Sequence, residues 1–305
     1  MNNFQADSSA KGKRLDIYLT EKFPEKSRSN IQKLISEGKI TVDEKIVKPN
    51  YKIVGGENIF FEKFEPVEGN FFAENLPLNI LYEDEDIIVV NKIRGMTVHP
   101  AENVTSGTLV NALLFHCKDL SGINGVKRPG IVHRLDKNTS GVMVAAKNDF
   151  AHVNLAEQIK NKTAIRTYLA IVHGVLKDNA GIINGAIGRD KFDRKKMAVT
   201  SDGKFAVTEF KVLERFKNFT YIKCKLQTGR THQIRVHMAE IGHPLVGDDK
   251  YSARKNPFDI KGQALHSHTL SLTHPVTGER MNFTAPLPDD MKKILELLND
   301  QRAVE

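Results

Sequence analysis

A carboxylate between two cations is the feature of this sequence that is best suited to chemistry. In HRLDKNTSG, residues 133–141, Asp136 is flanked by Arg134 and Lys137, and apolar residues stand on both sides of the run. Asp, Asn, Thr, Ser and Gly are also the residues that most often form turns. The run therefore has two interpretations: an ionised carboxylate held for catalysis, or a turn with no further role.

Other segments of the chain share a family pattern with this run. They are RTYLAIVHG at 166–174, IGRDKFDRKKMAV at 187–199, LQTGRTHQIRVHMAEIGHPLVGDDKY at 226–251 and QALHSHTLSLTHPVTGERMNFTAPLPDDM at 263–291. Together they resemble the RluA/RluD family of RNA pseudouridine synthases, and the segment at about 13–62 resembles an S4 RNA-binding domain. The resemblance covers roughly residues 13–293, with Ile93 where the family usually has Pro. Several motifs in the family's order are more specific than one motif, which favours the catalytic interpretation of Asp136.

The resemblance implies an isomerisation of uridine in which the N1–C1′ bond breaks and C5 rejoins C1′. We expect neither a cofactor nor a metal, because the reaction involves no redox change and no net hydrolysis. Asp136 would be the reacting carboxylate, as a nucleophile or as a base. An Arg of the segment at 226–251 would keep it ionised, with Arg235 as first assignment and Arg230 as second. Tyr168 would stack on the uracil, with its hydroxyl near the C5 proton, although its apolar neighbours also suit a core tyrosine.

A helix is predicted to present Arg235 over about residues 231–241. Ile234, Met238 and Ile241 would face inward, and Gly242 would end the helix. Arg235 would then flank the buried face, where an arginine is unlikely without an acidic partner.

The charge of the chain favours a polyanionic partner. Lys and Arg number 45 against 37 Asp and Glu, a net charge of +8, and the excess is local, since residues 11–39 are basic while 40–75 are acidic. The second helix of the S4-like segment and the cluster within 187–199 would contact the RNA backbone, and Arg134 would enter the RNA stack as the target base leaves it. The residues expected to contact RNA are Arg28, Lys33, Arg134, Arg189, Arg194, Lys195, Lys196 and Arg230. The expected substrate is 23S rRNA or a large-subunit assembly intermediate, with tRNA as the alternative.

The order of elements indicates an α+β protein of two domains. Residues 13–75 would form the S4-like domain and its linker, and 76–300 a synthase domain built on a mixed, largely antiparallel sheet flanked by helices. We expect a first helix that ends at Pro24, a second that Ser27 caps, and a later helix that Asp149 caps. The predicted strands lie near 40–42, 46–47, 59–61, 80–91 (two short strands), 142–146, 164–173 and 221–226.

Two rival functions are weighed against the synthase. A metal hydrolase is disfavoured, because His232 and His237 are five positions apart and lack the glutamate of the helical zinc motif. A catalytically silent ribosome-associated factor would need only the S4-like segment, and it would not need Asp136.

Cys117 and Cys224 are expected to be reduced core thiols. With no apolar stretch of about 20 residues and no signal-peptide core, we expect a cytoplasmic monomer.

Overall fold

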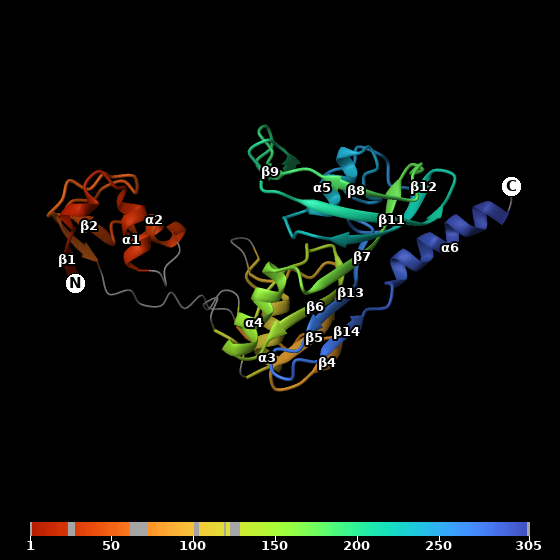
Figure 1. Cartoon of the computed structure of the whole chain (residues 1–305), viewed down its shortest axis with the longest axis horizontal. Helices are drawn as coiled ribbons and strands as arrows, with labels where there is room; N and C mark the ends of the chain where they lie inside the picture. Colours follow the sequence, from red (N-terminus) through yellow and green to blue (C-terminus); the bar gives the residue numbers. More distant parts are fainter. Residues whose placement is uncertain are drawn as a thin grey trace. The chain divides into compact units, whose positions relative to one another are not determined.

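The chain forms two compact units, residues 1–68 and 69–305 (Figure 1). The computed structural model describes residues 2–23, 28–61, 72–100, 104–118, 120–122 and 129–303. Each unit has its own hydrophobic core, so each is described by itself.

The N-terminal unit packs two helices on a three-stranded antiparallel sheet of order β1-β3-β2. Leu15, Leu19, Ile31 and Ile35 are buried against Ile59 in its core, as the helical periodicity predicts. The unit also includes a strand that precedes the S4-like segment. Its elements are β1 (Asn2–Gln5), the 3-10 helix η1 (Ser8–Ala10), α1 (Leu15–Lys22), α2 (Arg28–Ser36), β2 (Ile40–Val42) and β3 (Asn58–Phe61).

The strand predicted at residues 46–47 is wrong. Asp43 and Glu44 adopt positive φ values of 45° and 63°, and this turn ends β2. Only an isolated bridge between Val42 and Lys45 follows, and Ile46 is 73% exposed. The predicted helix end at Pro24 and the predicted cap at Ser27 lie outside the described residues.

The C-terminal unit is built on a nine-stranded mixed sheet of order β4-β5-β6-β13-β7-β12-β11-β8, with β14 paired to β13. The pairing of β6 with β13 is parallel and the other pairings are antiparallel. The predicted fold class is thereby confirmed. The elements are β4 (Ile80–Glu83), β5 (Ile87–Lys92), α3 (Leu109–His116), β6 (Ser140–Ala146), α4 (Asp149–Lys160), β7 (Ile165–His173), β8 (Ala180–Asn184), β9 (Ile187–Arg189), β10 (Met197–Val199), β11 (Val207–Arg215), β12 (Phe219–Leu226), α5 (Gln233–Glu240), β13 (Leu265–Thr273), β14 (Arg280–Thr284) and α6 (Asp289–Ala303).

Helices cover both faces of this sheet. Ile88 and Val90 of β5 join a core with α3 and α5, whereas Ile87 and Val89 face a second core with α4. Ile171 of β7 packs on α6 in a third. Successive side chains of a strand point to opposite faces, so α3 and α5 lie on one face and α4 and α6 on the other. The short hairpin of β9 and β10 stands apart from α3 and α4 (Figure 1).

Two helix boundaries differ from the predictions. Asn148 caps α4, because its side chain accepts a hydrogen bond from the Ala151 N–H, while Asp149 is the first helical residue. Helix α5 is shorter than predicted, and Ile241, just beyond its end, is 38% exposed. Gly242 follows with a φ of 81°, the left-handed conformation expected after a helix end.

The remaining bulk predictions concern cysteines and membrane helices. Cys117 and Cys224 are buried, reduced cysteines, as expected. Among the described helices, none combines the length and the apolar character needed to cross a membrane.

Candidate active site

Asp136 lies in a loop that immediately precedes β6, and backbone contacts hold this loop in place. The Lys92 ammonium donates to the carbonyls of Ile93, Met96 and Lys137, and burial lowers the pKa of Lys92 to about 7, with Arg94 adding to the shift. Thr139 N–H closes the turn by donating to the Asp136 carbonyl at 3.0 Å. The run is thus a turn, as its composition suggests, and it also presents a carboxylate.

Gly141 is required where this loop enters the sheet. Its φ is 114°, and a Cβ at this position would stand 2.1 Å from the Ser267 carbonyl oxygen. The parallel pairing of β6 with β13 brings Gly141 opposite Ser267, so no side chain fits between the two backbones. Gly141, the last residue of HRLDKNTSG, therefore fixes the point at which the loop that carries Asp136 enters the sheet.

Arg235, in the first turn of α5, joins Asp136 to a second carboxylate. Its Nη1 donates to Asp136 Oδ2 at 3.1 Å, while Nε and Nη2 donate to the two Asp248 oxygens at 2.7 and 2.8 Å. The Asp248 side chain is fully buried, whereas that of Asp136 is 18% exposed. These carboxylates raise the pKa of Arg235 despite its burial. Arg235, and not Arg230, is the cation that pairs with Asp136.

His232 approaches Asp136 from the other side. It precedes α5 with a φ of 58°, and its Nε2 lies 3.8 Å from Asp136 Oδ1. Its Nδ1 is 2.6 Å from the Tyr251 hydroxyl, whose oxygen accepts the Met197 N–H at 2.9 Å. The Tyr251 proton is therefore free to be donated to Nδ1. Burial lowers the pKa of His232, and the charges of Arg235 and Lys250 add to the shift while that of Asp136 opposes it. A neutral ring that accepts the Tyr251 proton at Nδ1 carries its own proton on Nε2, the nitrogen nearest Asp136.

Tyr168 reaches the same place from β7. It pairs with Cys224 of β12 and Ser267 of β13 at the centre of the sheet and is 5% exposed. Burial raises the pKa of its hydroxyl, and Asp136 adds to this, against opposing effects of Arg166 and of a hydrogen bond with Ser267. Tyr168 is both a core residue and a pocket residue, and its hydroxyl is protonated at neutral pH.

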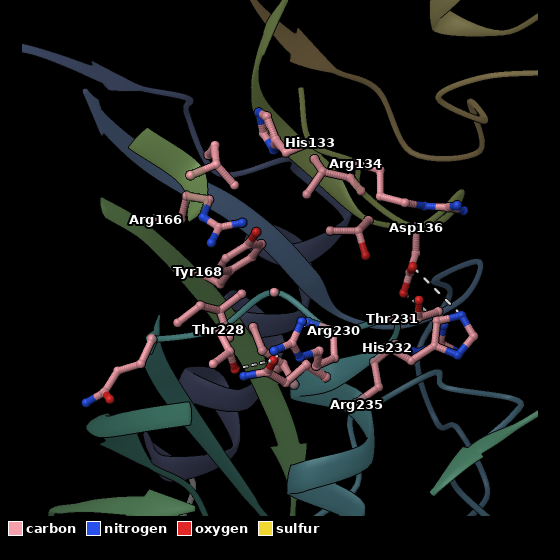
Figure 2. A pocket seen from close by; sticks show the side chains of 18 of the residues that line it. His133, Arg134, Asp136, Arg166, Tyr168, Thr228, Arg230, Thr231, His232 and Arg235 are labelled. Carbon is pink, nitrogen blue, oxygen red and sulfur yellow. Dashed lines mark hydrogen bonds and ion pairs between the residues drawn. The ribbon is translucent and has the colours of Figure 1, made fainter. Parts of the chain in front are cut away.

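These side chains line one pocket of about 430 Å³ (Figure 2). Asp136 and His232 lie on one side of it and Tyr168 on the other, with the loop that carries Thr228 and Arg230 between them. Asp136, Tyr168 and Arg235, distant in sequence, thus meet as predicted. The lining residues are Val132, His133, Arg134, Leu135, Asp136, Thr139, Ile159, Lys160, Lys162, Arg166, Tyr168, Leu226, Gln227, Thr228, Gly229, Arg230, Thr231, His232, Gln233, Ile234, Arg235 and Leu265.

The cations predicted to contact RNA lie in three places. Arg134 and Arg230 are exposed at the pocket, and Arg230 Nε donates to the Phe205 carbonyl. Arg189, Arg194, Lys195 and Lys196 are on the β9–β10 hairpin, whose Phe192 is 99% exposed. Arg28 and Lys33 are on α2 of the N-terminal unit, and the Lys33 side chain is outside the described part of the structure.

Arg28 and Gln32 of α2 also make contacts within the N-terminal unit. Both donate to the buried carboxylate of Asp16, which also accepts from Arg14. These hydrogen bonds outweigh the effect of burial and lower the pKa of Asp16 to about 2. Arg28 therefore links α2 to α1, and its side chain is still 47% exposed.

The histidines considered as metal ligands are not brought together. His232 faces Asp136, whereas His237 is buried between the Thr208 hydroxyl and the Gly185 carbonyl. The groups of potential ligands that do meet among the described residues lie away from the pocket, one at Glu83, His116 and Cys117 and one at Asp84, Asp86 and His274. In the second group, Asp84 accepts from His274 and from the Tyr82 hydroxyl.

Sequence reasoning missed three residues that shape the site. Asp248 is the buried partner of Arg235, and a buried arginine does call for an acid, but the neighbouring Asp249 is an equal candidate in the sequence. Tyr251 orients His232, and no local pattern predicts this contact. Arg166 lies in the segment 166–174, two positions before Tyr168. Residues two apart on a strand share a face, so this spacing could have placed Arg166 beside Tyr168.

Comparisons with known proteins agree with this fold and site. The RNA pseudouridylate synthase family matches residues 86–240, and the S4 domain family matches residues 13–59. The uncharacterized RNA pseudouridine synthase YlyB of Bacillus subtilis is 52% identical over 96% of each chain. The ribosomal large subunit pseudouridine synthase D of Pseudomonas aeruginosa is 44% identical over 95% of this chain and 93% of its own.

A solved structure of a pseudouridylate synthase domain has a similar fold. The human RNA pseudouridylate synthase domain containing 1 superposes with a TM-score of 0.57 at 25% identity, covering 74% of this chain and 96% of its own. The fold and the pocket define an RNA-modifying isomerase. The chain belongs to the RNA pseudouridine synthase family and carries an N-terminal S4 domain.

Proposed function

We propose that this isomerase converts uridine to pseudouridine in 23S rRNA, with Asp136 as the reacting carboxylate. The observation that carries the proposal is the pairing of a partly exposed Asp136 with the buried Arg235 at the edge of a pocket. Relatives that cover more than nine-tenths of this chain are named for the ribosomal large subunit, which supports rRNA over tRNA. The partner would be 23S rRNA, in the mature large subunit or in an assembly intermediate. The protein would act as a monomer in the cytoplasm.

The reaction needs a group that can break and remake a bond at C1′ without changing the redox state. The N1–C1′ bond breaks, the uracil turns, C5 bonds to C1′, and the C5 proton is lost as N1 gains one. Asp136 can add to the base or to the sugar, or can take the C2′ proton; all three roles need an ionised carboxylate. Arg235 Nη1 donates to one oxygen of Asp136 at 3.1 Å, and His232 Nε2 lies 3.8 Å from the other, so both face the carboxylate that would react.

Tyr168 would hold the uracil from the opposite side of the pocket. Its ring has the π-face on which a base can stack, and stacking tolerates the turning of the uracil. Because the hydroxyl is protonated at neutral pH, we assign it first as a donor to the moving base. Any transfer of the C5 proton to Tyr168 would require that this proton leave first.

The target uridine must leave the base stack of the RNA before it can enter the pocket. Arg134 is exposed next to Asp136 and is proposed to occupy the vacated position. Phosphates elsewhere would contact Arg230 at the pocket, the hairpin cations Arg189, Arg194, Lys195 and Lys196, and Arg28 and Lys33 in the S4 domain. Such contacts supply affinity and orientation and little sequence information.

Mapping pseudouridines in rRNA and tRNA tests the assignment of the substrate. Cells without the gene should lack one or more pseudouridines of 23S rRNA, and the wild-type gene should restore them. Restoration should fail with Asp136→Ala at equal protein levels. Loss confined to tRNA would refute the ribosomal substrate, and no loss in any RNA would favour a binding factor.

A further inference from the structure

Arg166 is a buried cation for which the described residues supply no acidic partner. It lies on β7, two positions before Tyr168, and is 7% exposed. No carboxylate among the described residues lies within ion-pair distance of it, and its Nε is buried without a hydrogen-bond partner. An unpaired buried guanidinium is costly, and arginine is rarely buried unless it is paired. The arrangement calls for an anion that the described part of the chain does not supply.

His133 adds a second unused donor to the same pocket. Its Nε2 accepts a hydrogen bond from the Val144 N–H at 3.2 Å, so the proton of the neutral ring is on Nδ1. That Nδ1 is also buried without a partner. Burial lowers the pKa of His133 to about 3, and the charge of Arg166 contributes, so the ring stays neutral at physiological pH.

The charges that line the pocket are unbalanced on the side of Arg166. Among the lining residues that the structure describes, Asp136 is the only one with a carboxylate, and Arg235 binds it together with Asp248. Lys160, the last residue of α4, and Lys162, in the turn before β7, also line the pocket. A Cβ at Gly229 would lie 3.2 Å from Arg166 Nη1, so the loop packs over the guanidinium with no side chain between them.

We infer that Arg166, assisted by His133, binds a phosphate of the nucleotide that occupies the pocket. Figure 2 shows Arg166 beside Tyr168 and across the pocket from Asp136 and His232. The guanidinium matches two phosphate oxygens at once and would be neutralised by them, which a neutral uracil carbonyl cannot do. The inference rests on the proposed function, because that function makes the ligand a nucleotide. The phosphate would anchor one end of the nucleotide while the base turns next to Tyr168.

The test compares the binding of three probes by the full-length protein: uridine, uridine 5′-monophosphate and uridine 3′-monophosphate. Dissociation constants are measured by ligand-observed NMR at one ionic strength. We expect one monophosphate to bind at least about 10-fold more tightly than uridine, as a charge-assisted contact would give. Whichever monophosphate is preferred identifies the phosphate, 5′ or 3′, that Arg166 contacts.

Substitution assigns this preference to Arg166. Arg166→Gln should abolish it and leave uridine binding unchanged, Arg166→Lys should keep part of it, and Arg254→Gln, at an exposed arginine outside the pocket, should leave it intact. Thermal unfolding of each variant checks the fold, and Arg166→Lys serves if Arg166→Gln does not fold.

Three results would overturn the inference. The first is equal binding of uridine and both monophosphates by the wild type, including no binding at all. The second is a preference that survives in Arg166→Gln. The third is an equal loss of all three probes in Arg166→Gln, which would indicate recognition of the uracil. The readout is binding and not turnover, so a protein that prefers the phosphate but forms no pseudouridine would refute the proposed function alone.

Discussion

Asp248 and Asp136 share the cation Arg235, and their removal should have opposite consequences for stability and for catalysis. Asp248 is fully buried and accepts two hydrogen bonds from the guanidinium, whereas Asp136 is partly exposed and accepts one. Removing one partner of a buried ion pair costs about 3–5 kcal/mol, because it leaves the other charge uncompensated. Asp248→Asn should therefore destabilise the C-terminal unit by that amount. At roughly 2–4 °C per kcal/mol for a unit of this size, its Tm should fall by about 6–20 °C.

Asp136→Asn is the matched change at the other end of the same guanidinium. An amide oxygen can still accept from Arg235, and an ion pair that solvent reaches contributes about 1 kcal/mol or less. Its Tm should therefore stay within about 4 °C of the wild type, while pseudouridine formation is abolished. Calorimetry of the two single variants and the double variant, together with RNA turnover, measures both effects. Equal destabilisation by the two substitutions would refute the view that Asp248 holds the charge and leaves Asp136 available to react.

Three further predictions concern the base platform, a buried histidine and the hairpin. Tyr168→Phe should keep RNA affinity and slow pseudouridine formation about 100-fold or more in single-turnover assays; an unchanged rate would show that the ring alone matters. The lowered pKa of His133 means that the unfolded chain binds its proton first, so stability should fall by up to about 1.4 kcal/mol per pH unit as pH drops from about 6.5 toward 3. In denaturant unfolding over this pH range, the stability of His133→Gln should lack this pH dependence. A pH dependence of stability identical to that of the wild type would contradict the prediction. Replacing Arg194, Lys195 and Lys196 by Gln should weaken RNA binding and lower its salt dependence, against a Lys211→Gln control that does neither.

The sequence predicted the fold class and the three residues that meet in the pocket. The fold class follows from the periodicity of strands and helices together with the resemblance to one family, and the three residues follow from the resemblance of their motifs to that family; both are local signals. Asp136, Tyr168 and Arg235 each stand inside such a motif, and all three line the same pocket.

What the sequence could not supply depends on contacts between distant segments. Whether Asp248 or Asp249 binds Arg235 is decided by the path of the chain after α5, which no local pattern fixes. Likewise helical periodicity counts apolar neighbours and does not register a buried acid, so it could not predict that Arg28 binds Asp16 of the preceding helix. The unpaired state of Arg166 is a property of everything around it and can be seen only in the folded protein.

The central claim is that this chain forms pseudouridine with the carboxylate of Asp136. Ribosomal RNA from cells without the gene, incubated with the purified protein and analysed by nucleoside mass spectrometry, tests it most directly. We expect the wild type to form pseudouridine in 23S rRNA, and Asp136→Asn, shown by its Tm to be folded, to form none. Pseudouridine formation by Asp136→Asn at a rate near that of the wild type would contradict the account.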